Sequence, residues 1–174
     1  MTKYRQEFRI ESARLREWDY ANPWWYYVTI NTKDHVEYLG KIENGQMTIN
    51  VLGKIVEKCW EGIPAHYNSV MLDYYVIMPN HVHGIIIINE TVETRHTSPL
   101  QPKHITLSDV IGSFKSAVTK KIHESGNNDF LWQPRFYDRI IRNEKELYNI
   151  RKYISENPAK WEIGKEKEEN ICDF

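Results

Sequence analysis

Hydrophobic positions recur along the chain with two different periods, one typical of strands and one typical of helices. Four stretches rich in β-branched and aromatic residues are expected to form strands: 24–31, 70–78, 82–88 and 136–141. Between short β-prone runs, Asn44-Gly45 has the composition of a tight hairpin turn. The chain is therefore expected to contain a sheet and a smaller hairpin.

Three other stretches place apolar residues at helical spacing: 52–60, 107–122 and 143–156. Thr106 and Asn143 are residue types that cap helices, and each has an acidic residue three positions on. The last helix is expected to end at Asn157-Pro158, because a residue that precedes proline disfavours the helical conformation.

The connection at Pro79-Asn80 is too short for a parallel crossover, which needs about a dozen residues. The sequence therefore predicts an α+β fold, an antiparallel sheet with helices packed on one face. A chain of 174 residues suits a single domain, which we assign to residues 1–161. Residues 162–174 are expected to form a charged tail with an acidic excess.

Composition narrows the function only slightly. With 41% hydrophobic and 27% charged residues, the chain is typical of a soluble globular protein. A net charge of -1 does not by itself indicate nucleic-acid binding, although basic residues outnumber acidic ones around the last helix. Six Trp and eleven Tyr could fill a core or stack on bases.

Location and redox chemistry follow from what the sequence lacks. No apolar run reaches the roughly 18 residues that span a bilayer, and no signal-peptide core begins the chain. Two cysteines without CxxC spacing indicate neither a disulfide framework nor a zinc site. We therefore expect a cytoplasmic protein without a membrane partner.

His81 and His83 are the first candidates for chemistry. In a strand, residues i and i+2 point to the same side, so both imidazoles leave the backbone on one face. Two neighbouring imidazoles in a hydrophobic strand suit a divalent metal. The alternative is that they are two polar side chains facing water at the start of a strand.

Tyr153 and Asn157 are the second candidates. They lie one helical turn apart, beside the apolar stripe of the last helix that must pack on the sheet. A tyrosine hydroxyl can attack a phosphodiester that a divalent ion polarises, giving a phosphotyrosine. The alternatives are a tyrosine that fills the core and an asparagine that ends the helix.

Three motifs in this order resemble one family: 75–86 with the two histidines, 132–142, and 153–158. The first is similar to the His-hydrophobe-His motif of the single-tyrosine HUH transposases. The other two resemble the branch of REP-associated tyrosine transposases. The similarity extends over about residues 19–161, most of the chain.

The resemblance implies a ferredoxin-like, RRM-like HUH fold and a DNA endonuclease that cuts and rejoins strands. His81, His83 and Asn157 would bind Mg²⁺ or Mn²⁺, and Tyr153 would become linked to the 5′ phosphate. Lys115 and Arg135 would contact the DNA backbone. The family's substrates are single-stranded DNA with a nearby hairpin, and related insertion-sequence enzymes are homodimers. The near-neutral charge and the acidic tail depart from the pattern of many DNA enzymes.

Two other functions suit the same sequence. A non-catalytic module could bind single-stranded nucleic acid by aromatic stacking, with the histidines as polar contacts. A metal-dependent nuclease could activate water in place of tyrosine. A covalent adduct between protein and DNA distinguishes the transposase from both.

Overall fold

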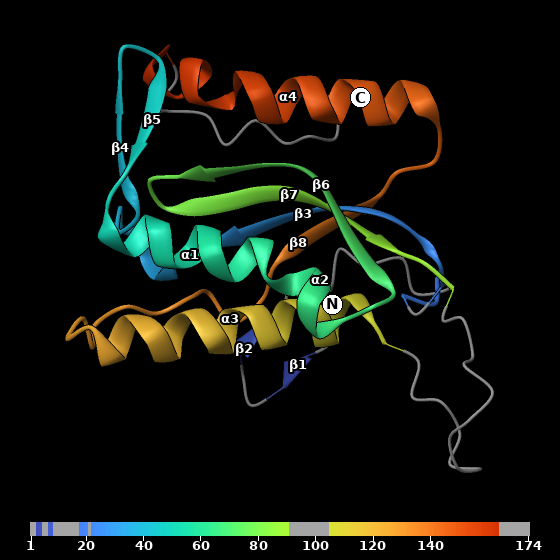
Figure 1. Cartoon of the computed structure of the whole chain (residues 1–174), viewed down its shortest axis with the longest axis horizontal. Helices are drawn as coiled ribbons and strands as arrows, with labels where there is room; N and C mark the ends of the chain where they lie inside the picture. The colour runs from blue at the N-terminus through green and yellow to red at the C-terminus, as the bar shows by residue number, and fades with distance from the viewer. Residues whose placement is uncertain (1–2, 5–6, 9–17, 21, 91–104, 164–174) are drawn as a thin grey trace.

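The computed structural model describes residues 3–4, 7–8, 18–20, 22–90 and 105–163 (Figure 1). Its strands are β1 (Lys3–Tyr4), β2 (Glu7–Phe8), β3 (Trp24–Asn31), β4 (Gly40–Glu43), β5 (Gln46–Ile49), β6 (Val70–Met78), β7 (His81–Ile88) and β8 (Tyr137–Ile140). Its helices are α1 (Val51–Glu61), α2 (Ile63–His66), α3 (Leu107–Glu124) and α4 (Glu144–Ile163), with a short 3-10 helix at Lys33–His35.

The main sheet has the strand order β6-β7-β3-β8, and every neighbouring pair is antiparallel. β7 and β3 are the central strands, and His83 of β7 lies opposite Thr29 of β3. β4 and β5 form a separate hairpin whose turn contains Asn44 and Gly45, both with positive φ. The predicted α+β class, the antiparallel sheet and the hairpin are confirmed.

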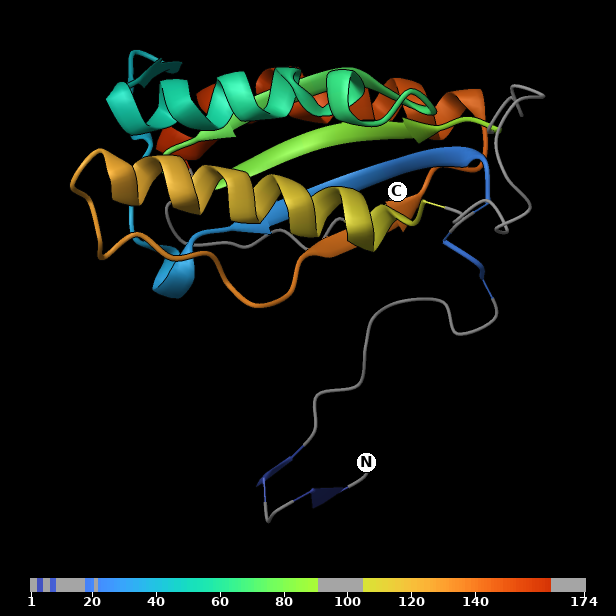
Figure 2. The ribbon, with the colours of Figure 1, turned by 60° about the horizontal axis from the view of Figure 1, so that its bottom comes forward.

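The helices, expected on one face of the sheet, divide between both faces. Alternate residues of β3 and β7 face α1 and α3, where they form the larger core with Trp60 and Phe114. The intervening residues face α4 and form a second core with Ile150 and Ile154. Figure 1 shows the sheet between α4 and the other helices, and Figure 2 shows α1 and α3 side by side. Every residue of β7 is buried, so both faces of the sheet require cover.

Both predicted helix caps are present. Thr106 accepts a hydrogen bond from the backbone N–H of Asp109, whose carboxylate accepts one from the backbone N–H of Thr106, forming a capping box at the start of α3. Asn143 accepts a hydrogen bond from the backbone N–H of Glu146 at 2.9 Å, ahead of α4. These local signals fix where α3 and α4 begin.

The predicted end of the last helix at Asn157-Pro158 is wrong. α4 continues to Ile163 with Pro158 inside it. Contacts from other elements hold the added turns: α4 touches β4 and β5, and a Cβ built on Gly45 would lie 3.4 Å from the Cα of Ala159. Figure 1 shows the β4–β5 hairpin reaching the C-terminal part of α4. Tertiary packing here overrides the local preference of the residue before proline.

Two sequence predictions fall largely outside the described residues. From its polar residues with Pro99 and Pro102, the sequence also predicts a loop over 89–103, which coincides mostly with 91–104. The charged tail predicted for 162–174 lies mostly beyond residue 163. None of the helices in the described part of the chain is both long and apolar enough to span a membrane.

Candidate metal centre and nucleophile

The two histidines of β7 lie together beneath α4. His81 and His83 are 8% and 4% exposed, and their side chains point to the α4 face because they alternate with Val82. Their Nε2 atoms are 2.9 Å apart, and the ring centres are 4.4 Å apart with an interplanar angle of 72°. The two nitrogens therefore converge on one small region, as the alternation of the strand predicts.

His81 is oriented by the residue before it. Its Nδ1 lies 2.6 Å from Oδ1 of Asn80, and Nδ2 of Asn80 donates to the backbone carbonyl of His35 at 3.0 Å. Because the amide nitrogen is turned to that carbonyl, Oδ1 is the atom that accepts from the imidazole. His81 therefore carries its proton on Nδ1 and presents a lone pair on Nε2.

His83 is oriented by two hydroxyls of β3. Its Nδ1 lies 2.7 Å from Oη of Tyr27 and 2.9 Å from Oγ1 of Thr29. Oγ1 of Thr29 also lies 3.1 Å from Oη of Tyr27. Burial raises the pKa of Tyr27 well above its usual range, so this phenol keeps its proton at neutral pH.

Burial also keeps both imidazoles neutral. It lowers the pKa of His81 to about 3, with a further contribution from the charge of His35. Burial lowers the pKa of His83 well below 6.5, and repulsion from His81 adds to the effect. A neutral imidazole with a free nitrogen lone pair is the form that binds a metal ion.

The spacing of the two nitrogens fits two adjacent ligands of one ion. Two donors that each bind one ion at about 2.0–2.1 Å lie no more than about 4.2 Å apart. The Nε2 atoms, 2.9 Å apart, meet this condition, and the same distance also allows an N–H···N hydrogen bond between them. Within the described residues, no group of three or more His, Cys, Asp or Glu lies close enough together to hold a metal ion.

One face of α4 covers the histidines. The ring of Tyr153 lies 5.4 Å from that of His83, and the ring of Trp161 lies 5.6 Å from that of His81. Asn157 stands between them, one helical turn from each, and is 8% exposed. The structure thus brings Tyr153 and Asn157 to the sheet face that carries the two histidines.

The ammonium group of a lysine lies near the ring of Tyr153. Nζ of Lys160 lies 5.9 Å from the ring centre of Tyr153 and 3.4 Å from a carboxylate oxygen of Glu156. Lys160 and Trp161 belong to the site but were not predicted, because the expected helix ended before them. In a helix that continues past Pro158, their spacings of seven and eight residues from Tyr153 place both residues on the same helix face as Tyr153.

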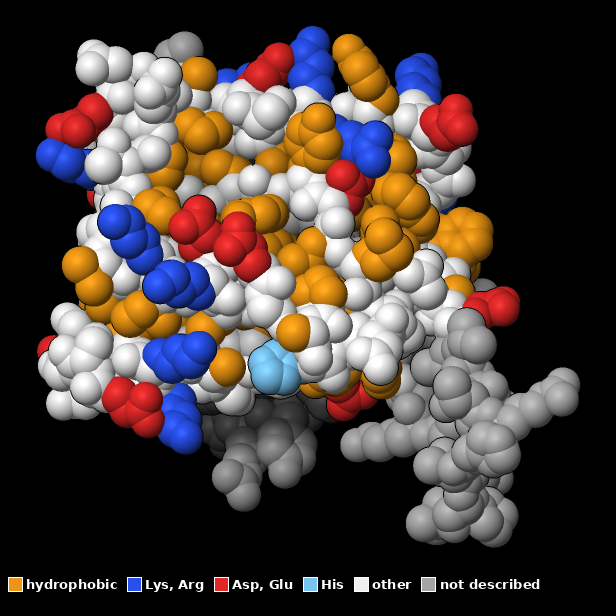
Figure 3. All heavy atoms as spheres, viewed as in Figure 1, with side chains coloured by type: hydrophobic (Ala, Val, Ile, Leu, Met, Phe, Trp, Pro, Cys, Tyr) orange, Lys and Arg blue, Asp and Glu red, His pale blue; other side chains and the backbone are white. Residues whose placement is uncertain are grey.

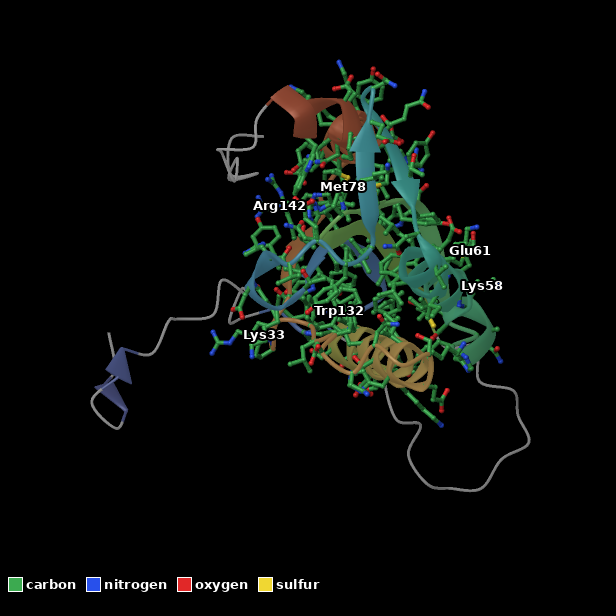
Figure 4. All side chains as sticks on the ribbon, turned by 90° about the vertical axis from the view of Figure 1, so that its left-hand side faces the viewer. Lys33, Lys58, Glu61, Met78, Trp132 and Arg142 are labelled. Atoms are coloured by element: carbon green, nitrogen blue, oxygen red, sulfur yellow. The ribbon has the colours of Figure 1, made fainter. Side chains whose placement is uncertain are left out.

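Lys115 and Arg135 lie apart from this group, on the side of the sheet that carries α3. Nζ of Lys115 donates to the backbone carbonyls of Gln133, of Pro134 at 3.3 Å and of Arg135 at 3.4 Å. Burial lowers the pKa of Lys115, while Arg135 is exposed. Figure 4 shows Trp132 of the same segment between the sheet and α3.

The fold of this chain has a counterpart among solved structures. The fold is similar to that of a solved REP-associated tyrosine transposase bound to a REP hairpin, with a TM-score of 0.60. That match covers 86% of this chain and 74% of the other at 19% sequence identity. The resemblance drawn from the three sequence motifs is thereby confirmed at the level of the fold.

A closer relative fixes the family. Over 160 residues the chain is 40% identical to an uncharacterized protein of Haemophilus influenzae, covering 87% of this chain and 89% of that protein. The chain belongs to the same family as the Haemophilus influenzae protein. No protein-family model matches the sequence.

Proposed function

We propose that the protein is a transposase: a metal-dependent endonuclease and strand transferase that acts on single-stranded DNA through a 5′-phosphotyrosine. The observation that carries the proposal is the sheet face under α4. There two neutral imidazoles with Nε2 atoms 2.9 Å apart lie beside a tyrosine ring 5.4 Å from His83. The fold shared with a REP-associated tyrosine transposase supports the same conclusion.

His81, His83 and Asn157 would hold the ion, Mg²⁺ or Mn²⁺. The fit rests on the Nε2 spacing and on the position of Asn157, whose side chain makes no hydrogen bond to the other described residues. When bound, a divalent ion neutralises and polarises the scissile phosphate. The two imidazoles and the amide set where that phosphate lies beneath α4.

Tyr153 would be the nucleophile. Its hydroxyl oxygen forms a bond to phosphorus, the bond from phosphorus to the 3′ oxygen breaks, and that oxygen takes up a proton. The phenol proton passes to water, and the charge on Lys160 near the ring stabilises the phenolate as it forms. The 5′ phosphate remains on Tyr153, and a 3′ hydroxyl can later attack it to rejoin a strand.

Single-stranded DNA with a hairpin is the proposed substrate. The similar transposase was solved with a REP hairpin. Aromatic side chains lie beside α4 in this protein: Tyr74 is 50% exposed and Trp25 is half-buried, and the guanidinium carbon of Arg151 on α4 lies 5.4 Å from the ring centre of Tyr74 and 5.9 Å from that of Trp25. Figure 3 shows hydrophobic side chains intermixed with both basic and acidic ones on the face that carries β6 and α4. Exposed aromatic rings of this kind can stack on unpaired bases.

Arg135, an exposed residue, is proposed to contact the DNA backbone through its guanidinium group. Lys115 would support that contact, because its ammonium group binds the carbonyls of the segment that carries Arg135. A homodimer and a cytoplasmic location complete the proposal, and sedimentation of the purified protein with and without hairpin DNA tests the first.

The test is covalent capture of DNA. The protein is incubated with Mn²⁺ and 5′- or 3′-labelled single-stranded oligonucleotides that carry a hairpin, and adducts are resolved on a denaturing gel. Tyr153→Phe should abolish the adduct while DNA binding survives, because the ring contacts with His83 and Tyr27 remain. Tyr148→Phe is the matched control, since Tyr148 lies on the same helix but faces solvent, and should retain full yield.

Two other results would overturn the proposal in favour of the alternative functions. Binding that is insensitive to EDTA, without any adduct in Mn²⁺, indicates a non-catalytic binding module. Metal-dependent cutting without an adduct, at a rate unchanged by Tyr153→Phe, indicates a nuclease that activates water.

A further inference from the structure

The two histidines differ in what they meet at Nδ1. His81 faces an amide oxygen of Asn80 at 2.6 Å, whereas His83 faces the hydroxyls of Tyr27 and Thr29. An amide oxygen only accepts hydrogen bonds, while a hydroxyl can either donate or accept. The pair therefore has one fixed partner and one adaptable partner.

The fixed side determines the proton on His81. Asn80 cannot rotate its amide without losing the hydrogen bond from Nδ2 to the carbonyl of His35. With Oδ1 toward the imidazole, Nδ1 of His81 must donate, and Nε2 keeps a lone pair. The proton therefore stays on Nδ1 of His81 whether or not a metal ion binds the Nε2 lone pair.

The proton position on His83 follows from the 2.9 Å distance between the two Nε2 atoms. A hydrogen bond at that distance to the lone pair of His81 requires a proton on Nε2 of His83. Nδ1 of His83 is then an acceptor, and the hydroxyl of Tyr27, 2.7 Å away, donates a hydrogen bond to it. Thr29 completes a directed chain, because its hydroxyl donates to Oη of Tyr27 at 3.1 Å.

We propose that Asn80, Tyr27 and Thr29 are positioning residues that make His81 a preset ligand and His83 a ligand that changes tautomer. The change rests on the proposed function, because it occurs when Nε2 of His83 takes up a divalent ion. His83 then loses the Nε2 proton to water and gains one at Nδ1. The hydroxyl chain reverses, so that Nδ1 donates to Tyr27 and Tyr27 donates to Thr29.

The proton balance of this step is closed. One proton leaves the imidazole of His83 and one arrives, through the hydroxyl chain from water, so the ring is neutral before and after. Without an amphoteric partner at Nδ1, the ring would lose its hydrogen bond in one of the two tautomers. A buried polar atom left without a partner destabilises that tautomer.

Nitrogen NMR tests the assignment directly on the full-length, ¹⁵N-labelled protein. Two-bond ¹H–¹⁵N correlation spectra distinguish the two neutral tautomers, and His81→Gln and His83→Gln assign the signals. After EDTA treatment, we expect His81 with its proton on Nδ1 and His83 with its proton on Nε2. Saturation with Mg²⁺ should move the proton of His83 to Nδ1 and leave His81 unchanged.

Each contrary result has its own meaning. A proton on Nδ1 of His83 before Mg²⁺ is added, or a change of tautomer at His81, overturns the unequal roles. The expected tautomers after EDTA, with no response to Mg²⁺ or Mn²⁺ at millimolar concentration, refute the tautomer change and also the metal site of the proposed function.

Variants separate positioning from packing. Tyr27→Phe keeps the buried ring and removes one hydroxyl, and combined with Thr29→Val it should weaken Mn²⁺ binding about 10–100-fold. The loss is measured from the electron paramagnetic resonance signal of free Mn²⁺. Tyr26→Phe is the matched control, because Tyr26 lies on the same strand but its hydroxyl bonds Asn22 and Trp18.

The control should bind Mn²⁺ as tightly as the natural protein. Melting temperatures identify variants that bind weakly only because they unfold. A folded double variant with unchanged Mn²⁺ affinity would overturn the roles of Tyr27 and Thr29.

Discussion

Gly84, which directly follows His83, lies where β7 passes closest to a helix. A Cβ at this position would lie 2.9 Å from Cη2 and 3.1 Å from Cε2 of Trp60, and closer still to Cζ2. Ordinary carbon contacts are about 3.5–4.0 Å, so Gly84→Ala requires the indole or the strand to move by roughly 1 Å. Trp60 is fully buried, with its ring 5.3 Å from that of Phe114.

The loss of stability caused by Gly84→Ala follows from the lack of space around Trp60. Overpacking of a filled core destabilises proteins by about 1–3 kcal/mol, and the absence of room around Trp60 places this case toward the upper end. For a domain of this size, the melting temperature should fall by roughly 2–12 °C. Because β7 also carries His81 and His83, a shifted strand should weaken Mn²⁺ binding as well.

Urea unfolding followed by tryptophan fluorescence measures the effect. Gly112→Ala is the matched control: Gly112 lies inside α3, where an added Cβ meets nothing within 4 Å. The same substitution there should stabilise the protein by about 0.5–1 kcal/mol through helix propensity and reduced freedom of the unfolded chain. A Gly84→Ala variant as stable as the natural protein would refute the close packing of Trp60 on β7.

Three further predictions concern protons, metal and the α3 side of the sheet. Because burial lowers the pKa of His81 to about 3 and that of His83 well below 6.5, the unfolded chain binds more protons between these values. The free energy of unfolding should therefore fall as the pH is lowered from 6.5 toward 3. In urea titrations at several pH values, a variant with both histidines replaced by Gln should lose much of this dependence on pH. An equal dependence in the variant would contradict the burial argument. Asn157→Ala should weaken Mn²⁺ binding at least about tenfold, measured by electron paramagnetic resonance, whereas the exposed Ser155→Ala should not; equal affinities would remove Asn157 from the ligand set. Lys115→Met should lower the free energy of unfolding by about 1–2 kcal/mol, because it leaves backbone carbonyls without a donor. The side chain of Lys120 is 77% exposed, so the control Lys120→Met should leave the free energy of unfolding unchanged. Equal stability of the two variants would show that Lys115 does not hold the 133–135 segment.

Much of the site follows from two periods in the sequence. The two-residue period of a strand places His81 and His83 on one face of β7. The 3.6-residue period of a helix places Tyr153 and Asn157 on one face of α4. The apolar stripe through Ile150 and Ile154 then requires that helix face to meet the sheet. These relations are local, so the sequence is sufficient to predict them.

The remaining features depend on contacts between distant segments. The length of α4 beyond Pro158 depends on the β4–β5 hairpin, whose turn touches Ala159. The partners of His83 depend on the register that sets Thr29 opposite it. Neither contact leaves a signal in the local pattern, and both determine which side chains complete the site.

Identification of the residue that becomes linked to DNA tests the central claim most directly. Trypsin cleavage after Lys152 and Lys160 releases an eight-residue peptide, Tyr153–Lys160, in which Tyr153 is the single tyrosine. After reaction with single-stranded DNA and Mn²⁺ and digestion of the DNA, mass spectrometry should find a nucleotide attached through phosphate to this peptide. Attachment to another tyrosine, or cleaved DNA with this peptide unmodified, would contradict the account.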